Sequence, residues 1–237
     1  MKKRLLDSVT LLTVTSIKLE DSVDALKYNL RGMAFESVKF ISHAKPPNLP
    51  KHIAFCECEP IDSLESYSRF MMYRLKDFVD TPYCLSIQRD GVIVHPKKWQ
   101  DSFLNYDYIG APWPLSEAFI DPFGNAQRVG NGGFSLRSKR FLNVPTDAQI
   151  PFYSSKNELH EDVMQCVEYR HIFERLGLAF APMEVARHFS HEMKIPEIKG
   201  LKPFGFHKYR KQNRYYPRFP GKIQKFFKRY EYPPQKT

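Results

Sequence analysis

Two acidic positions carry the side chains most able to do chemistry in this sequence. Asp90 follows the apolar run 83–87 and stands directly before a glycine. Glu161 and Asp162 stand together at the start of a helix-forming segment. A carboxylate can take a proton from a hydroxyl group or bind a divalent cation. The alternative interpretations are a simple Asp-Gly turn at Asp90 and helix capping by the acidic pair.

A glycine-rich stretch between these acids is the third feature with chemical potential. The segment 128–138 has three glycines on the approach to a short apolar strand at 134–136. Glycine lets the backbone lie directly against a ligand, because no side chain intervenes. We therefore expect Asn131, Gly132, Gly133 and Phe134 to pass close to a bound molecule.

The elements that must position these residues follow an alternating order. Residues 9–15, 38–41, 53–56 and 83–87 have the β-branched or apolar character of buried strands, and residues 21–30 and 64–78 have helical periodicity. A strand–helix–strand order predicts an α/β fold with a mostly parallel, mixed central sheet flanked by helices. In such a sheet Asp90 would lie at the carboxyl end of a central strand, where open α/β sheets bind ligands.

The second half of the chain predicts shorter elements around a long loop. Residues 106–113 form a strand that runs into a loop at 114–127, a length that is usually functional or mobile. The other expected elements are short helices at 99–104 and 138–142, a helix at 161–176 and a strand at 178–181.

The net charge of +10 is concentrated at the carboxyl terminus. From Lys208 to Arg229 there are nine Lys or Arg residues and no Asp or Glu, interleaved with Tyr and Phe. We expect one domain at 1–207 and a basic, aromatic tail at 208–237. Such a tail suits an anionic membrane surface, and it is also the one feature that favours a nucleic-acid-binding protein.

Cysteine usage and the amino terminus predict a cytoplasmic protein. The four cysteines have neither zinc-site spacing nor a disulfide pattern, so we expect reduced thiols. Asp7 breaks the apolar run near the amino terminus, so no signal peptide is expected, and no run is long enough to span a bilayer.

The order of these features resembles the GT-A class of nucleotide-sugar-dependent glycosyltransferases. The features are Asp90, the glycine-lined strand, the Glu161-Asp162 pair and the late histidines His188, His191 and His207. Residues 106–113, 129–138, 161–163 and 203–207 are most similar to a bacterial family of GT-A-like proteins catalogued as a domain of unknown function. The resemblance implies a Rossmann-like nucleotide-binding half, and it covers residues 9–207.

For the donor side, the resemblance implies a divalent cation, Mn²⁺ or Mg²⁺, bound by Asp90 and His207. Gln88 stands where the class has the first acid of an Asp-x-Asp motif, and a neutral amide is a weaker ligand, which weakens the case for metal dependence. Arg89 would neutralise phosphate directly, or would simply be a surface arginine. By the same analogy Thr13, Thr15 and Ser16 flank the nucleotide base. His188 and His191 are expected to be packed or surface residues.

For the acceptor side, the resemblance implies Asp162 as the base of an inverting enzyme and Glu161 as its orienting or capping partner. Trp113 and Phe134 are the acceptor candidates: Trp113 would stack on an acceptor sugar, with a core position as the alternative, and Phe134 belongs to the stretch 131–134 that would pass under the donor sugar or the acceptor. The implied function is transfer of a hexose from a nucleotide-sugar, such as a UDP-sugar, to a lipid-linked glycan in bacterial surface polysaccharide synthesis. A non-catalytic sugar-binding relative is the second hypothesis, and a nucleic-acid-binding protein is the third.

Overall fold

The computed structural model describes residues 3–155 and 159–208, so the predicted tail lies outside the described residues except for Lys208. A six-stranded sheet forms the centre, in the order β3-β2-β1-β4-β9-β6. These strands are β1 (Arg4–Val14), β2 (Met33–Ser42), β3 (Ala54–Glu57), β4 (Tyr83–Ile87), β6 (Tyr108–Ile109) and β9 (Phe134–Ser138).

The sheet is mixed and mostly parallel, which confirms the predicted fold class. β1 pairs in parallel with both β2 and β4, and β2 pairs in parallel with β3. β9 is antiparallel to both of its neighbours, β4 and β6. The carboxyl ends of β1 and β4 therefore meet at one edge of the sheet, next to the amino-terminal end of β9.

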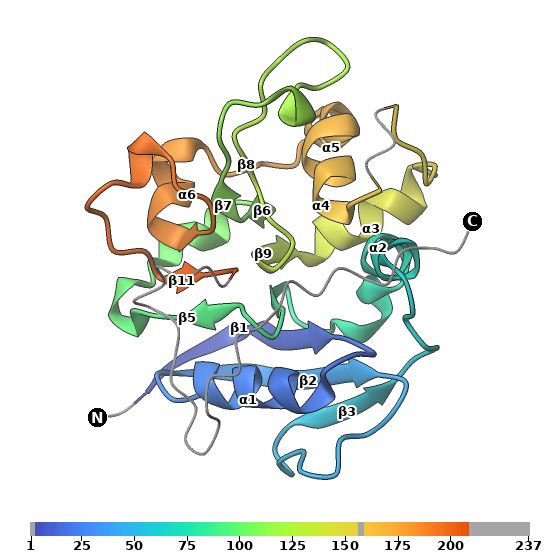
Figure 1. Cartoon of the computed structure of the whole chain (residues 1–237), viewed down its shortest axis with the longest axis vertical. Coiled ribbons are helices and arrows are strands. Elements are labelled where there is room, and N and C mark those ends of the chain that lie inside the picture. Colours follow the sequence, from blue (N-terminus) through green and yellow to red (C-terminus); the bar gives the residue numbers. More distant parts are fainter. Residues whose placement is uncertain (1–2, 156–158, 209–237) are drawn as a thin grey trace.

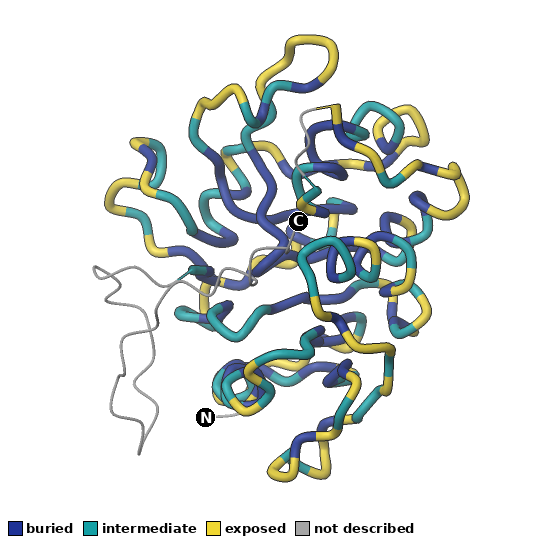
Figure 2. The backbone as a smooth tube through the Cα atoms, turned by 45° about the vertical axis from the view of Figure 1, so that its right-hand side comes forward, coloured by how far each residue is buried: buried dark blue, intermediate teal, exposed yellow. Residues whose placement is uncertain are grey.

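Helices cover both faces of this sheet (Figure 1). α1 (Leu19–Asn29) buries its apolar side chains with those of β1 and β2 in one core. α2 (Leu64–Tyr73) and α3 (Lys139–Asp147) contribute to the second core on the other face. Figure 2 shows the central strands as the most continuously buried part of the backbone. Ser63 caps α2 and Ser138 caps α3 by accepting hydrogen bonds from backbone N–H groups, which explains where both helices begin.

Two small sheets complete the fold, and in Figure 1 the two-stranded sheet lies above the three-stranded one. The three-stranded sheet has the order β10-β11-β5, from β5 (Val92–Ile93), β10 (Ser190–His191) and β11 (Gly205–Phe206). The two-stranded sheet pairs β7 (Ala111–Pro112) with β8 (Val129–Gly130). The three-stranded sheet is adjacent to a cluster of contacting aromatic rings from Trp99, Phe103, Phe134, Phe189 and Phe204.

The predicted helix at 161–176 is interrupted. It consists of α4 (Glu161–Val163), a π-helical stretch at Met164–Glu168 and α5 (Arg170–Arg175). Periodicity alone does not reveal such a change, because one inserted residue barely alters the pattern of apolar side chains. π-helical turns are rare and occur often at functional sites.

Three further predictions need correction. The expected strand at 178–181 makes only an isolated bridge from Phe180 to Tyr108, because it has one short neighbour to pair with. Residues 183–189 form α6 (Met183–Phe189), which the sequence prediction missed because the segment is short and starts after a proline. The strand predicted at 9–15 begins earlier, at Arg4, with a register shift between Leu6 and Thr10.

Short 3₁₀ turns join these elements, at Leu75–Phe78, Pro96–Lys98, Asp101–Asn105, Glu117–Phe119 and Pro196–Ile198. Within the described ranges, no helix combines the length and the apolar character needed to cross a bilayer.

Candidate functional site

Asp90 lies in a tight turn at the carboxyl end of β4, as predicted. The N–H of Gly91 donates to the carbonyl of Gln88 over 2.8 Å, and the N–H of Gln88 donates to the carbonyl of Gly133 over 2.9 Å. Asn29 of α1 holds the far side of the turn, since its amide donates to the Gly91 carbonyl over 3.1 Å and accepts from the N–H of Ile93. The turn is therefore fixed to both the glycine-rich segment and α1.

His207 reaches Asp90 because β11 pairs antiparallel with β5, with Phe206 opposite Val92. The Nε2 atom of the His207 ring lies 3.4 Å from Oδ1 of Asp90 and 3.2 Å from Oε1 of Gln88. The other ring nitrogen, Nδ1, lies 3.3 Å from Oε1 of Glu192. The histidine is thus held between two carboxylates on opposite sides of its ring.

This arrangement shifts the pKa values of all three groups. Burial lowers the pKa of His207, but the charges of Asp90 and Glu192 outweigh it and raise the pKa to about 10. Burial raises the pKa of Asp90, but His207 and then Arg89 outweigh it and lower the pKa to about 2. The pKa of Glu192 is also lowered: burial opposes the shift, and the His207 contact outweighs it. Without a metal, His207 is therefore a cation between two anions.

The donor set at Nε2 fits a hard or borderline divalent cation. Three donor atoms converge there: Asp90 Oδ1, Gln88 Oε1 and His207 Nε2. Their separations from Nε2, 3.4 and 3.2 Å, are a few tenths of an ångström longer than the edges of an octahedral site, which are about 3 Å for metal–oxygen bonds of about 2.1 Å. Gln88 presents its oxygen because its amide nitrogen donates to the hydroxyl of Tyr67 over 3.2 Å.

Carboxylate and histidine side chains alone do not supply three ligands for a metal ion at this point. In the described part of the chain, no group of three or more His, Cys, Asp or Glu side chains could hold a metal ion. Glu192 is excluded from the donor set because it faces the opposite ring nitrogen. A metal at this point would therefore depend on the Gln88 amide as its third protein ligand.

The glycine-rich segment runs directly beneath this cluster. A Cβ atom on Gly133 would lie 2.0 Å from Nε2 of His207, and a Cβ on Gly132 would lie 2.1 Å from Oε1 of Glu161. Neither residue can carry a side chain without moving its neighbour. The two adjacent glycines thus let the backbone touch the Asp90–His207 cluster on one side and the Glu161-Asp162 pair on the other.

The two adjacent acids at the start of α4 have different surroundings. Glu161 is buried and forms an ion pair with Arg137 of β9, whose side chain is fully buried, at 2.7 Å. Asp162 is half-buried, and its Oδ2 accepts the N–H of Gly132 over 2.8 Å. Glu161 is thus an anchor for the helix beside Gly132, and Asp162 is the acid that accepts the Gly132 N–H and is not tied into an ion pair with Arg137.

Asp162 has a pKa raised from 3.8 to about 6, first because of burial and second because of the neighbouring Glu161 charge. The Gly132 N–H and His160 oppose this rise. A carboxylate that titrates near neutral pH matches the requirement for a general base, because it is ionised at neutral pH and still basic enough to take a proton.

Asn131 has a backbone conformation that few residues adopt, with φ of 81°. Its Oδ1 accepts the N–H of Gly133 over 2.9 Å, which stabilises this left-handed turn. Its amide Nδ2 is buried and has no hydrogen-bond partner among the described residues. Asn131 therefore shapes the glycine-rich segment, and it keeps one unused donor next to the cluster.

The predicted nucleotide-side residues lie at the carboxyl end of β1, beside β4. Thr15 is engaged in a local turn, where its hydroxyl donates to the carbonyl of Ile17 over 2.6 Å. The hydroxyl of Ser16 accepts the N–H of Ile61 over 2.8 Å. Thr13 is buried, and its hydroxyl has no hydrogen-bond partner in the described ranges. β1 and β4 run parallel, so these residues and Gln88 share one edge of the sheet.

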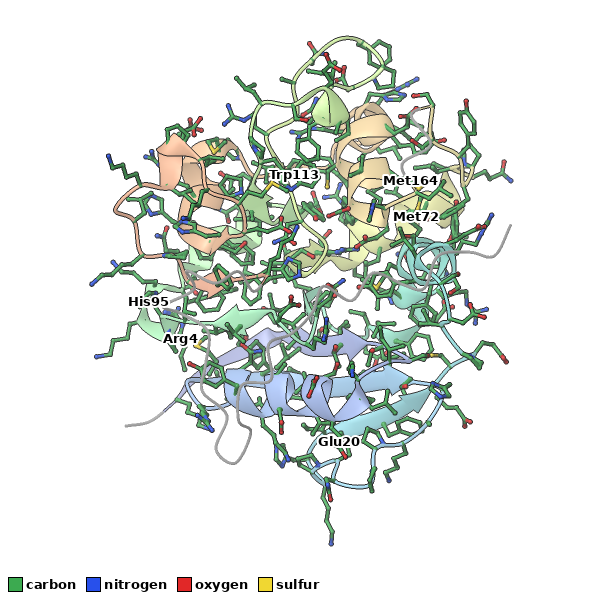
Figure 3. All side chains as sticks on the ribbon, in the orientation of Figure 1. Arg4, Glu20, Met72, His95, Trp113 and Met164 are labelled. Carbon is green, nitrogen blue, oxygen red and sulfur yellow. The ribbon has the colours of Figure 1, made fainter. Side chains whose placement is uncertain are left out.

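Two predicted acceptor residues are in fact core residues. Trp113 is 2% exposed and stacks on Phe119 at a ring separation of 4.1 Å, with its ring against Gly130. Figure 3 shows it inside the molecule, below the loop at the top of the view. Phe134 is fully buried against Phe189. Neither ring has an open face for a sugar, because the glycine-rich segment presents its backbone instead.

The remaining histidines do not join the cluster. The Nε2 atom of His191 lies 2.8 Å from the carbonyl of Arg187, and burial lowers the pKa of His191 to about 4, so the ring is neutral. His188 lies at the end of α6 with a lowered pKa, first because of burial. Both residues thus match the expectation of packed or surface positions.

Sequence reasoning missed three residues that organise the site: Asn29, Arg137 and Glu192. Their partners are 62, 24 and 15 residues away in the chain, counted from Asn29 to Gly91, from Arg137 to Glu161 and from Glu192 to His207. The available signal for Arg137 was a charged residue within an apolar strand pattern. Glu192 had a weaker signal, as a carboxylate directly after a histidine-rich segment.

The comparisons with known proteins identify a family. The family model described as "Protein of unknown function (DUF5672)" matches residues 51–207. This match confirms the resemblance to a family catalogued as a domain of unknown function. No curated protein matches the sequence.

Similar solved structures include three glycosyltransferases, the class that the sequence motifs resemble. One is the galactosyltransferase LgtC in complex with donor and acceptor sugar analogues, at 13% identity and TM-score 0.48, over 84% of this chain and 86% of that chain. A second is a glycosyltransferase involved in glycosylation of the major capsid of PBCV-1, at 14% identity and TM-score 0.44, over 84% and 91%. A third is the mannosyltransferase PcManGT from Pyrobaculum calidifontis with GDP-Man and Mn²⁺, at 8% identity and TM-score 0.47, over 75% and 55%.

Such low identities and TM-scores carry no information about activity. The family match is different, because it spans more than half of the chain and includes Asp90, the glycine-rich segment, Asp162 and His207. The protein therefore belongs to the DUF5672 family.

Proposed function

We propose that this protein is a glycosyltransferase that moves a sugar from a nucleotide-sugar to a hydroxyl group of a glycan. One observation carries the proposal: Gly133 contacts His207 beside Asp90, and the adjacent Gly132 contacts Asp162. The Asp90–His207 cluster, which would bind the charged leaving group, and Asp162, which can take a proton, thus lie on either side of two residues without side chains. Sugar transfer with inversion needs these two functions on opposite sides of the anomeric carbon.

The residues divide between the two halves of the reaction. Asp90, Gln88 and His207 would hold a divalent cation, Mn²⁺ or Mg²⁺, which would neutralise the charge of the departing nucleotide diphosphate. Arg89 adds positive charge beside them, as its effect on the pKa of Asp90 indicates. Thr13, Thr15 and Ser16, at the same edge of the sheet, are the proposed contacts for the nucleotide base.

Asp162 is the proposed general base of an inverting reaction. The acceptor oxygen would attack the anomeric carbon while its proton passes to the free lone pairs of the Asp162 carboxylate. The bond from the anomeric carbon to the phosphate oxygen breaks, and its electron pair leaves with the nucleotide diphosphate. The Gly132 N–H and the Glu161–Arg137 ion pair hold the position of Asp162 during this step.

The finer assignments follow from the sequence resemblance. We propose a UDP-sugar as the donor and a lipid-linked precursor of a surface polysaccharide as the acceptor. The four cysteines are all free, which suits a cytoplasmic location. The family match ends at His207, which supports the proposed domain boundary after residue 207. We propose that the basic, aromatic tail contacts anionic lipid because of its Lys and Arg residues.

A nucleotide-sugar-binding protein without turnover is the second candidate. The observation that favours it is the neutral Gln88 ligand, which leaves Asp90 as the one carboxylate among the three converging donors. A cation held by so little negative charge would bind weakly. Binding of a nucleotide-sugar with no release of nucleotide would support this candidate.

The test is a screen of nucleotide-sugars for nucleotide release, with and without Mn²⁺ or Mg²⁺, on the wild-type protein and on Asp90→Ala. We expect release by the wild type that depends on the cation, and none by the variant. The same pair is measured by thermal shift with UDP and Mn²⁺, where Asp90→Ala should lose the stabilisation. A wild type that neither binds nor hydrolyses any nucleotide-sugar would refute the proposal.

A further inference from the structure

Glu192 is a buried carboxylate with no role in the proposed reaction. It follows β10 directly, and its side chain is 8% exposed. A carboxylate in that position loses much of its hydration, so it needs compensating contacts. Among the described residues, Oε1 of Glu192 forms ion-pair contacts with Nδ1 of His207 at 3.3 Å and with Nζ of Lys208 at 3.6 Å.

The register of the small sheet sets the contact between Glu192 and His207. β10 and β11 run parallel, with His191 opposite Phe206, so the residues that follow, Glu192 and His207, are neighbours. The N–H of His207 also donates to the carbonyl of His191 over 3.0 Å. The pairing is therefore built into the backbone and does not depend on a flexible loop.

The His207 ring is fixed from three directions. Nε2 faces Asp90 and Gln88, Nδ1 faces Glu192, and the backbone of Gly133 lies against the ring. His207 can bind a cation through Nε2 only as the tautomer that carries its proton on Nδ1. The Glu192 carboxylate, 3.3 Å from Nδ1, favours that tautomer because its negative charge stabilises a proton on Nδ1, although the contact lacks hydrogen-bond geometry in this structure.

We propose that Glu192 is a positioning residue for the metal site: it orients His207, selects the tautomer that binds through Nε2, and supplies a second negative charge close to the cation. The charge matters because Gln88 is neutral, so Asp90 alone among the three donors is anionic. The inference rests on the proposed function in one respect, which is that Nε2 of His207 binds a divalent cation.

The experiment measures Mn²⁺ binding to the full-length chain by electron paramagnetic resonance of the free ion. Glu192→Leu should weaken binding by a factor on the order of 10 to 100, the range typical for loss of an outer-shell partner. Glu192→Gln keeps the shape of the side chain and should fall between Glu192→Leu and the wild type. The matched control is Glu168→Gln, because Glu168 is another largely buried glutamate but contacts Ser155, away from the site.

The tautomer of His207 separates positioning from general structural damage. Nitrogen-15 spectra of the histidine rings in the presence of Mg²⁺ should show His207 protonated at Nδ1 in the wild type, and a mixture of tautomers in Glu192→Leu. Should Glu192→Leu not fold, Glu192→Gln alone still tests the inference in both measurements.

Two results overturn the inference, and they are distinguishable. If the wild type binds Mn²⁺ and both Glu192 variants bind it equally well, Glu192 has no positioning role and the metal site itself survives. If the wild type binds no Mn²⁺ with or without UDP, the metal site of the proposed function fails, and the inference fails with it.

Discussion

At the scale of single residues, Glu161 and Asp162 show how neighbouring acids come to differ. Glu161 points into the core and pairs with Arg137, whereas Asp162 points to the backbone of Gly132. Successive side chains on a helix point about 100° apart, so the two acids approach Gly132 differently: Glu161 lies where a Cβ of Gly132 would be, and Asp162 accepts the Gly132 N–H. The sequence identified the pair, and the structure assigns the buried ion pair to Glu161 and the accessible carboxylate to Asp162.

Asp162→Asn should reduce turnover by a factor on the order of 100 to 10,000, with donor binding near normal, because an amide cannot take the acceptor proton. Steady-state kinetics and nucleotide titration measure the two effects separately. Glu161→Gln should instead destabilise the fold by about 3 kcal/mol or more, because it leaves Arg137 buried without a full counter-charge. Near-native turnover in Asp162→Asn would place the base elsewhere.

The pH dependence of Asp162 gives a prediction for both activity and stability. Its pKa is raised from 3.8 to about 6, so kcat/KM should rise with pH and level off above about pH 6. Between about pH 4 and pH 6 the folded state binds more protons at this carboxyl group than the unfolded chain does. The free energy of unfolding should therefore fall as the pH rises through this range. Asp162→Asn should remove that contribution, which urea denaturation at several pH values measures; an unchanged slope would contradict the shift.

At the scale of elements, the ends of three strands lie together at the site. β4 ends before Gln88, β9 begins after Gly133, and β11 ends before His207. The hydrogen bond from Gln88 N–H to the Gly133 carbonyl ties the first two, and the antiparallel pairing of β11 with β5 delivers the third. Each contact is a backbone contact, so the geometry depends on strand register more than on any single side chain.

Gly133→Ala tests this close approach. The added Cβ would lie 2.0 Å from Nε2 of His207, so the ring must move and stabilisation by UDP with Mn²⁺ should be lost. Gly124→Ala is the control: a Cβ there meets nothing within 4 Å, but φ is 88°, so it should cost about 1 kcal/mol of stability from backbone strain alone. If Gly133→Ala keeps the full ligand-induced thermal shift, His207 is not a ligand.

At the scale of the whole molecule, one sheet serves both halves of the proposed reaction. The parallel strands β1 and β4 bring the nucleotide-side residues to the edge where Asp90 lies, and α4 brings Asp162 to the same edge through Gly132. The first 50 residues lie outside the family match, yet β1 and β2 pair within this sheet. The proposed domain therefore needs its amino-terminal strands as well as the matched region.

Truncation after Tyr209 should spare nucleotide binding, because the cut follows His207, and should weaken binding to vesicles that contain anionic lipid. The removed segment carries most of the nine basic residues between 208 and 229. The expected reduction is largest at low salt, since exposed charges are screened at high ionic strength. Co-sedimentation with anionic and neutral vesicles measures it. Equal vesicle binding before and after truncation would exclude the tail as a membrane contact. DNA binding that depends steeply on salt and is lost on truncation would instead favour the nucleic-acid hypothesis.

The sequence by itself determined the parts that depend on local pattern. Runs of β-branched and apolar residues located β3, β4 and the carboxyl-terminal parts of β1 and β2, although β1 and β2 begin earlier than predicted, at Arg4 and Met33. The order of strands and helices predicted a mostly parallel sheet with Asp90 after β4. Glycine spacing located the close approach at 132 and 133. These features are readable because each one is a property of consecutive residues and their periodicity.

Only the tertiary structure decided which side chains meet. Trp113 and Phe134 carry the same aromatic signal as a sugar-stacking residue, but packing against Phe119 and Phe189 buries them. The neighbours of His207 depend on the register between β5, β10 and β11, three strands of two residues each that have no readable periodicity. Burial and strand register arise from contacts between distant parts of the chain, and a single sequence carries no direct record of those contacts.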